Sequence, residues 1–197
     1  MSALKYPPLV SIDDYLAGEI ASSIKHEYLG GVLHAMAGGS NRHNAIALNC
    51  LLSLGAQLRG KSCRPFNSDT KVRIRHAEQT RFYYPDFMVV CEQNPDSDFF
   101  QDHPTVIGEV LSDSTRRTDL GEKLEAYLDI PSLNALILVE PDTAAVTVHR
   151  RLSDGSGFRM ERFEISNDTI SLPEIDAELP LSEVYEAIDF SDNDKVT

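Results

Sequence analysis

Two apolar stretches, each interrupted by a single acidic residue, constrain this chain more than any other feature. FYYPDFMVV (residues 82–90) contains Asp86, and TVIGEVL (residues 105–111) contains Glu109. Runs this apolar and this rich in β-branched side chains predict central strands of a sheet that is covered on both faces. A carboxylate in such a strand is costly unless it is paired, hydrogen-bonded or bound to a cation. Two of them in neighbouring strands need a common explanation.

A divalent cation supplies that explanation. Mg²⁺ takes oxygen ligands, usually one or two carboxylates, with water and substrate phosphate completing its shell. Asp86 and Glu109 side by side match this requirement, with Mn²⁺ as an alternative ion. For either carboxylate taken alone, a solvent-exposed strand end or an ion pair with arginine is the simpler interpretation. The two together favour a metal site.

Hydrophobic periodicity and turn residues predict the remaining elements. Ser11 is expected to begin a short helix, and paired glycines at 30–31 and 38–39 bracket a strand. Further helices are predicted over 41–58, from Thr118 to Pro131 and over 182–189, and further strands over 71–75, 135–140, 145–151 and 158–165. The length of 197 residues predicts one domain, residues 1–190, followed by an acidic disordered tail over 191–197.

The charge of the chain is acidic overall but uneven along its length. The net charge is -13, and residues 161–197 hold 11 acidic against 2 basic residues. Residues 59–81 carry seven basic and two acidic side chains, a net +5. An acidic protein does not coat nucleic acid non-specifically, because that binding rests on neutralising phosphates. Contact with phosphates is therefore expected to be local.

Five basic side chains are candidates for such contacts with substrate. Lys71, Arg73 and Arg75 alternate with Val72 and Ile74, so one face of a predicted strand is basic and the other is apolar. Two further candidates, Arg116 and Arg117, lie in the turn before the predicted helix. Basic strand faces and basic turns are more often simply solvated.

Lys123 lies at the edge of the apolar stripe of the helix predicted after Thr118. It can reach over the central strands from there, where a lysine can orient a water molecule or stabilise the charge on a phosphate. The alternative is a surface ion pair with Asp119, four residues earlier, which contributes only a few tenths of a kcal/mol, roughly. On spacing alone the two interpretations carry similar weight.

No apolar run is long enough to span a membrane, and the N-terminus lacks the pattern of a signal peptide. We therefore expect a cytoplasmic protein. Its three cysteines, Cys50, Cys63 and Cys91, are widely spaced and form no metal-binding motif, so that reduced thiols are the simplest expectation.

Several segments carry a family resemblance. They are HEYLGGVLHAMAGGSNRHNAIALN, SDTKVRI, YYPDFMVVCE, GEVLSDSTRRTDLGEKLEAYLDIPSL and ALILVEPD. Over residues 13–187 they resemble the Uma two family of endonucleases in the PD-(D/E)XK superfamily. The resemblance implies an α/β, restriction-endonuclease-like fold, in which helices flank a mixed β-sheet and a Mg²⁺-dependent site lies at the edge of the sheet.

The resemblance also implies roles for individual residues. Asp86 matches the Asp of PD and Glu109 the first position of (D/E)XK, so both would be metal ligands. The usual lysine would fall at Leu111, and Lys123 matches a family lysine in the following helix that would replace it. Glu27, in KHEYLGG, matches an acidic position of the superfamily's N-terminal region and would complete the catalytic set.

Two other polar residues receive structural rather than catalytic interpretations. His43 resembles a family position at the start of the second helix, where a capping or turn-stabilising role is the more frequent case. Asp69, in SDTKVRI, is expected to begin the basic strand.

Two main functions remain open from the sequence, and hydrolysis of a different phosphodiester, such as RNA or a small nucleotide, through the same site is a third possibility. One is a Mg²⁺-dependent endonuclease that hydrolyses phosphodiester bonds, with DNA favoured over RNA as the nucleic-acid partner. The other is a catalytically silent or partner-dependent module that retains the nuclease fold for binding or assembly. Leu111 and the acidic charge favour the module, and the presence of Asp86, Glu109 and Lys123 favours the enzyme. A homodimer that juxtaposes two basic patches would reconcile the acidic charge with DNA binding.

Overall fold

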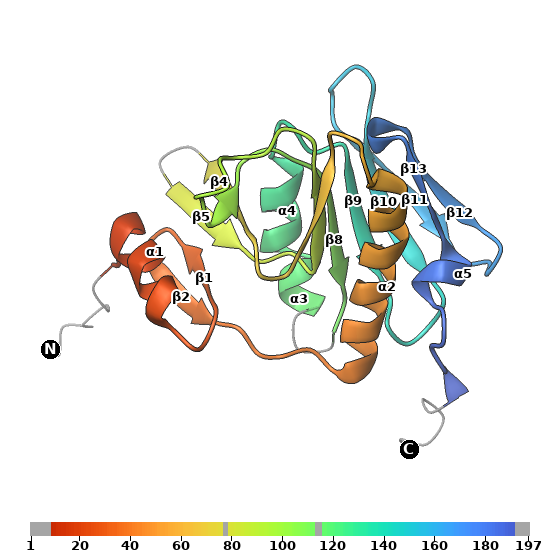
Figure 1. The fold of residues 1–197 in the computed structure, drawn as a ribbon, viewed down its shortest axis with the longest axis horizontal. Helices are drawn as coiled ribbons and strands as arrows, with labels where there is room; N and C mark the ends of the chain where they lie inside the picture. The colour runs from red at the N-terminus through yellow and green to blue at the C-terminus, as the bar shows by residue number, and fades with distance from the viewer. Residues whose placement is uncertain (1–8, 77–78, 113–115, 192–197) are drawn as a thin grey trace, which may run out of the picture.

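A computed structural model describes residues 9–76, 79–112 and 116–191 of the chain (Figure 1). Its helices are α1 (Ile12–Ala21), α2 (Asn41–Leu58), α3 (Arg116–Asp119), α4 (Glu122–Leu128), the 3-10 helix η1 (Pro173–Ile175) and α5 (Leu181–Val184). The helices flank mixed sheets, which confirms the fold class that the family resemblance implies, but the strands divide between two mixed sheets and a two-stranded hairpin where one central sheet was expected. None of the helices in these residue ranges is long and apolar enough to cross a membrane.

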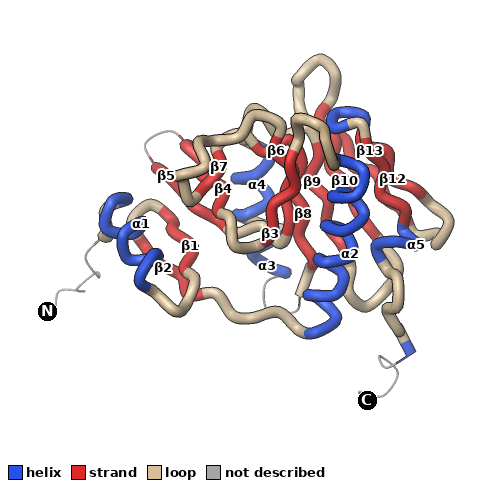
Figure 2. The backbone as a smooth tube through the Cα atoms, in the orientation of Figure 1, coloured by secondary structure: helices blue, strands red, loops and turns tan. Residues whose placement is uncertain are grey.

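The larger sheet runs through the middle of the molecule (Figure 2). Its strands, in spatial order, are β11 (Phe158–Phe163), β10 (Val146–Arg151), β9 (Ala135–Val139), β8 (Pro104–Val110), β6 (Phe87–Val90) and β3 (Arg64–Asn67). β8 and β9 are parallel, and the other pairs are antiparallel. β8 is a central strand and every residue of it is buried, which confirms the prediction for residues 105–111. The strands predicted over 135–140, 145–151 and 158–165 are confirmed as β9, β10 and β11, which pair antiparallel in chain order.

Successive side chains along the strands of this sheet point to opposite faces, and each face packs into its own hydrophobic core. Phe87, Val89 and Val106 face α2, α5 and the hairpin of β12 (Thr169–Leu172) and β13 (Ala177–Pro180). Met88 and Ile107 face the other side, toward α4 and the smaller sheet. Both faces of the central strands are therefore covered, and this explains why their sequences are almost continuously apolar.

The smaller sheet has the order β2 (Val32–Ala35), β1 (His26–Leu29), β5 (Gln79–Tyr83), β4 (Lys71–His76) and β7 (Phe100–Gln101). One face packs against α1 through an aromatic cluster of Tyr15, Tyr28, Phe82 and Phe100. The other face contributes Val72, Ile74 and Tyr83 to the core beneath α4. The predicted alternation of β4 is thus confirmed for its apolar face.

Two of the helix predictions are confirmed and two are corrected. The Ser11 side chain caps α1 by accepting a hydrogen bond from the Asp14 amide, and α2 has the predicted bounds. The single helix expected after Thr118 is wrong, because the chain forms α3 and α4 with a break at Gly121. A Cβ at Gly121 would lie 2.8 Å from the Arg117 carbonyl oxygen, so glycine permits the tight turn. The final helix is shorter than predicted.

The prediction of one strand over residues 82–90 is also wrong. The chain leaves β5 at Tyr83 and enters β6 at Phe87, and these strands belong to different sheets. Pro85 lies in the break, where its missing N–H cannot serve a sheet ladder. The consequence is that Asp86 lies at the entrance to β6 rather than in the middle of a strand.

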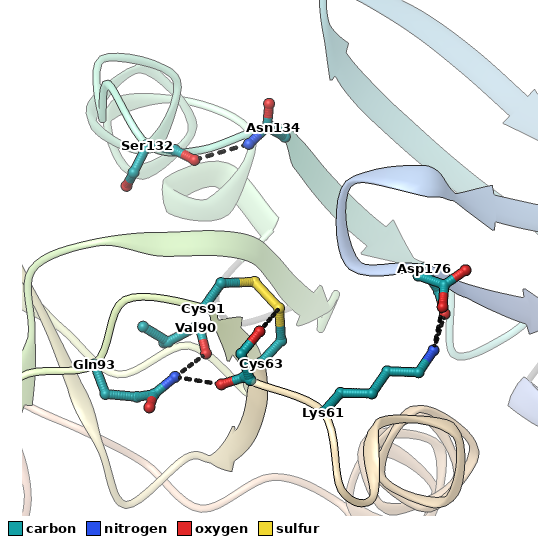
Figure 3. The surroundings of a disulfide bond; sticks show 9 residues. Lys61, Cys63, Val90, Cys91, Gln93, Ser132, Asn134 and Asp176 are labelled. Carbon is teal, nitrogen blue, oxygen red and sulfur yellow. Dashed lines mark hydrogen bonds and ion pairs between the residues drawn. A yellow bond between two sulfur atoms is a disulfide. The ribbon is translucent and has the colours of Figure 1, made fainter.

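The cysteines differ from the sequence expectation. Cys63 and Cys91 form a disulfide (Figure 3). Cys50 is free and buried. Arg64 pairs with Val90 in the antiparallel ladder of β3 and β6, so the two cysteines are the next residues outward. The Gln93 side chain closes this end by donating to the Ser62 and Val90 carbonyl oxygens. Strand register therefore explains a pairing that spacing in the sequence does not reveal.

Removing this disulfide is expected to destabilise the protein. The bond closes a loop with a sequence separation of 28, for which chain entropy gives about 3.5 kcal/mol. The double variant Cys63→Ser/Cys91→Ser should therefore lose up to about that free energy of unfolding in urea. The same loss should follow when the native chain is treated with a reductant. A reductant-insensitive urea midpoint for the native chain would contradict the prediction.

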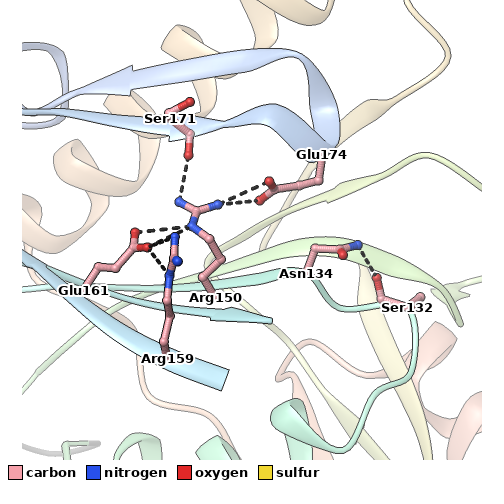
Figure 4. A network of polar contacts seen from close by, with 7 residues as sticks. All are labelled: Ser132, Asn134, Arg150, Arg159, Glu161, Ser171 and Glu174. Carbon is pink, nitrogen blue, oxygen red and sulfur yellow. Dashed lines mark hydrogen bonds and ion pairs between the residues drawn. The ribbon is translucent and has the colours of Figure 1, made fainter. Parts of the chain in front are cut away.

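A partly buried arginine fixes the C-terminal hairpin to the larger sheet (Figure 4). The Arg150 guanidinium, on β10, lies 3.3 Å from carboxylate oxygens of both Glu161 and Glu174. It also donates to the Ser171 carbonyl oxygen on β12 at 2.7 Å. This network joins three segments that the sequence analysis did not connect.

The predicted disordered tail over 191–197 lies outside the described residues except for Ser191.

Candidate active site

Asp86 and Glu109 occupy adjacent positions on neighbouring strands of the larger sheet. Phe87 faces Gly108 in the antiparallel ladder of β6 and β8, so Asp86 and Glu109 are the next residues along the chain on either side. A Cβ at Gly108 would lie only 1.9 Å from the Phe87 ring, so glycine makes room for that ring. The structure thus brings together the two carboxylates that the sequence singles out.

Glu109 is a buried carboxylate with two hydrogen-bonding partners from α4. Tyr127 donates its hydroxyl proton to Glu109 Oε1 at 2.8 Å, and Lys123 Nζ lies 2.9 Å from the same oxygen. Glu109 and Leu111 lie on the same face of the chain, and Leu111 is packed into the core there. The lysine expected at position 111 is therefore replaced by one that reaches Glu109 from the helix.

Lys123 is the centre of a buried ionic cluster. Its Nζ lies 3.3 Å from Glu27 Oε1 on β1 and 3.6 Å from Asp119 Oδ1 on α3, in addition to Glu109. The Lys123, Asp119 and Glu109 side chains are all at least nine-tenths buried. Two sheets and two helices therefore contribute to one cluster, which we call the Lys123 cluster: Glu27, Glu109, Asp119 and Lys123.

The Lys123 cluster holds more negative than positive charge. Three carboxylates surround one ammonium, which leaves an excess of two negative charges when all four groups are ionised. Burial raises the pKa of Glu109 to about 8, against the opposing charge of Lys123. Burial lowers the pKa of Lys123, but the three carboxylates outweigh that effect and the net change is upward. The cluster therefore favours binding an additional positive charge.

Asp86 is held from the other side of the sheet. Its Oδ2 accepts a hydrogen bond from the Val110 amide at 2.7 Å and lies 3.1 Å from Nε2 of His43. His43 lies in the first turn of α2, and its amide donates to the side chain of the N-cap residue Ser40. The hydrogen bond to Asp86 raises the pKa of His43, against the effect of burial. His43 therefore contacts the site, which the interpretation as a capping residue did not include.

The structure corrects one alternative and adds two residues. Asp119 and Lys123 do form an i,i+4 pair, but both side chains are buried, so a surface pair is wrong. Asp119 and Tyr127 contact Lys123 and Glu109, although the sequence analysis placed neither of them in the site. Their signal was present in the spacing of the acidic residue and the tyrosine around the EK of the helix.

The five predicted substrate-binding residues are placed differently from one another. Arg73 forms two hydrogen bonds with Asp102, at 2.7 and 2.6 Å, and Arg75 lies within 3.8 Å of the same carboxylate. Arg116 is paired with Glu140, whereas Arg117 is exposed. Lys71 is buried. Lys25 pairs with Asp69, so Asp69 lies outside the Lys123 cluster. Residues 113–115 of the polar turn lie outside the described residues.

The chemistry of the donors fits a hard divalent cation. Asp86, Glu109 and Glu27 offer carboxylate oxygens, and Mg²⁺ needs only one or two of these because it keeps several water ligands. In the described part of the chain, no three His, Cys, Asp or Glu side chains are already arranged to hold an ion by themselves. Asp86 and Glu109 would hold the ion. Glu27 lies near them, because the Lys123 ammonium contacts both Glu27 and Glu109.

Comparison with known proteins places this arrangement in a family. Residues 12–182 match the sequence profile of Uma2, a family described as "Putative restriction endonuclease". The chain belongs to the Uma2 family. The match covers every residue of the Lys123 cluster and also Asp86 and His43.

Relatives of this Uma2 protein share most of its length. Two uncharacterized proteins of Synechocystis sp. (strain PCC 6803) are each 29% identical to it, over 184 and 149 residues. These alignments cover 93% and 74% of this chain, and 95% and 83% of the relatives. A crystal structure from Anabaena variabilis, described as "a putative nuclease belonging to DUF820", superposes with a TM-score of 0.68 at 17% identity. It covers 94% of this chain and 98% of its own, which confirms the predicted fold.

Proposed function

We propose that this Uma2 protein is a Mg²⁺-dependent endonuclease that hydrolyses phosphodiester bonds in DNA. The observation that carries the proposal is the convergence of Asp86 and Glu109 at adjacent strand positions, with Lys123 Nζ 2.9 Å from Glu109. Paired carboxylates next to a lysine are suited to phosphodiester hydrolysis, because metal ligands and a positive charge meet where a phosphate would sit.

Some residues of the chain orient the two carboxylates, and Lys123 supplies a positive charge. Val110 and His43 orient Asp86, and Tyr127 and Lys123 orient Glu109, so that both carboxylates are fixed before an ion arrives. Lys123 remains protonated, and its charge opposes the negative charge that builds up on phosphate oxygens in the transition state. Asp86 and Glu109 would hold Mg²⁺, which would supply a water molecule of lowered pKa and a positive charge beside the phosphate.

One observation favours the alternative of a binding or assembly module without catalysis. Lys123 Nζ lies within 3.6 Å of three carboxylates, so substrate phosphate must compete with them for the ammonium. A module that only binds nucleic acid would not need Lys123 to be released. Cleavage assays distinguish the two functions directly.

The test is cleavage of end-labelled single-stranded DNA, duplex DNA and RNA by the full chain with Mg²⁺ or Mn²⁺. We expect cleavage of DNA, none after chelation with EDTA, and at least about a 100-fold loss for Glu109→Gln, since even outer-shell partners of a metal contribute 10- to 100-fold, roughly. Glu92→Gln is the matched control, because Glu92 is an exposed glutamate. Absence of cleavage with every substrate, or equal cleavage by Glu109→Gln, would contradict the proposal.

A further inference from the structure

Lys71 is a buried cation whose ammonium forms no ion pair with a carboxylate of the described residues. Only 5% of this residue, the first of β4, is exposed, and in the described part of the chain no carboxylate lies within 4.0 Å of its Nζ. Lys71 Nζ donates a hydrogen bond to the Phe99 carbonyl oxygen at 3.4 Å. Burial lowers the pKa of Lys71. Lysine is almost never fully buried unless it is paired. An ammonium carries three hydrogen-bond donors, and the Phe99 carbonyl oxygen takes one of them, so the other donors can bind a ligand.

A cavity of about 370 Å³ opens beside this ammonium. Ile20, Ile24 and Phe99 line it, and each of these apolar side chains is more than half exposed. The Tyr84 ring forms another wall, and its centroid lies 5.1 Å from Lys71 Nζ. The cavity, called the Lys71 pocket below, therefore combines apolar and aromatic walls with a buried hydrogen-bond donor.

The loop that presents Phe99 is held in place by side-chain hydrogen bonds. Asn94 donates to carboxylate oxygens of Asp98 and Asp102 at 3.1 Å, and its own carbonyl accepts from the Asp102 amide at 3.0 Å. Arg73 anchors Asp102 in turn. Phe99 is thus exposed on an ordered support, and a ligand that stacks on it would lose little free energy to ordering of the loop.

We propose that the Lys71 pocket binds one unpaired nucleobase of the nucleic-acid substrate. The base stacks on Phe99, and a carbonyl oxygen of the base accepts a hydrogen bond from Lys71. A base matches the pocket better than a phosphate does, because Glu19 and Asp69 line the cavity together with Lys25 and Lys71, and Lys25 is paired with Asp69, so the cavity offers a phosphate no net positive charge. The inference rests on the proposed nuclease function and predicts that the substrate of that function contains an unpaired base.

The position of the pocket connects it with the candidate active site. Tyr84 precedes Asp86 by two residues, so their Cα atoms lie at most about 7 Å apart. A strand whose scissile phosphate reaches Asp86 therefore passes near the pocket. A base enters such a pocket only when it is unpaired, so the geometry predicts preference for single-stranded or locally opened DNA over an intact duplex.

Binding of fluorescent oligonucleotides tests the inference, with Glu109→Gln present in every protein to suppress cleavage. Phe99→Ala should weaken binding of single-stranded DNA about 10-fold, the effect of losing one base stack, and change duplex binding less than about 2-fold. Lys71→Met should weaken single-strand binding as well. Met160→Ala is the control, because Met160 is an exposed apolar residue on β11, and it should leave the Kd unchanged. Thermal unfolding of each variant checks that it is folded.

An oligonucleotide in which all bases are replaced by abasic sites makes the test specific. The parent protein should bind it more weakly than the normal single strand, and Phe99→Ala should weaken that binding no further. Unchanged affinity of Phe99→Ala for the normal strand, in a protein whose wild type cleaves DNA, would overturn the pocket alone. If the wild type neither cleaves nor binds any nucleic acid, both the pocket and the proposed function fail.

Discussion

Lys123→Met is expected to lower the rate of DNA cleavage by about 100-fold or more and to destabilise the metal-free protein by about 3 kcal/mol. Methionine keeps most of the side-chain volume but removes the charge that contacts Glu109, Glu27 and Asp119. Removing one partner of a buried ionic cluster leaves carboxylates uncompensated, which costs more than the loss of a surface pair. Urea unfolding with EDTA measures the stability, and the labelled-DNA assay measures the rate.

The response to a divalent ion separates the electrostatic role of Lys123 from simple packing. If charge balance is the cause of the instability, Mg²⁺ should stabilise Lys123→Met by more than it stabilises the wild type. Lys61→Met is the matched control, since Lys61 forms an exposed pair with Asp176 and should cost less than about 1 kcal/mol with no effect on cleavage. Normal cleavage by Lys123→Met would refute the catalytic role.

The sequence was sufficient to predict the central strand β8 and the convergence of Asp86 with Glu109. Carboxylates in apolar runs are informative because burial makes them costly, so they persist only where something compensates them. The bounds predicted for helix α2 agree with the structure, since its apolar residues recur with a clear helical periodicity. These signals are local, because the residues that carry each one lie within or next to the element that it predicts.

Other features depend on contacts between distant segments, which no local pattern contains. The disulfide requires the register of β3 against β6, and the hairpin of β12 and β13 was missed because its short strands carry little periodicity. Burial of Asp119 and Lys123 depends on their packing against Glu27 and Glu109, which lie far away in the sequence. Spacing alone could not distinguish this pair from an exposed one, because i,i+4 geometry is the same in both.

Asp86→Asn should abolish measurable binding of Mn²⁺ while leaving the metal-free protein folded. Asparagine keeps an oxygen that can accept the Val110 amide, so the local backbone should persist. It removes one of the negative charges that oppose ionisation of Glu109, so the metal-free variant should be as stable as the wild type or slightly more stable. The affinity should fall about 100-fold or more, measured from the electron paramagnetic resonance signal of free Mn²⁺.

Asp96→Asn is the matched control, because Asp96 is an exposed aspartate whose nearest basic group, Arg64, lies 3.9 Å away. It removes the same formal charge from the protein and should leave Mn²⁺ affinity unchanged. A loss of affinity in both variants would mean that the ion responds to overall charge rather than to Asp86. Retained affinity in Asp86→Asn would place any bound ion elsewhere and remove the basis for assigning Asp86 as a ligand. Loss of affinity in Asp86→Asn alone would tie the ion to the position where β6 begins beside Glu109.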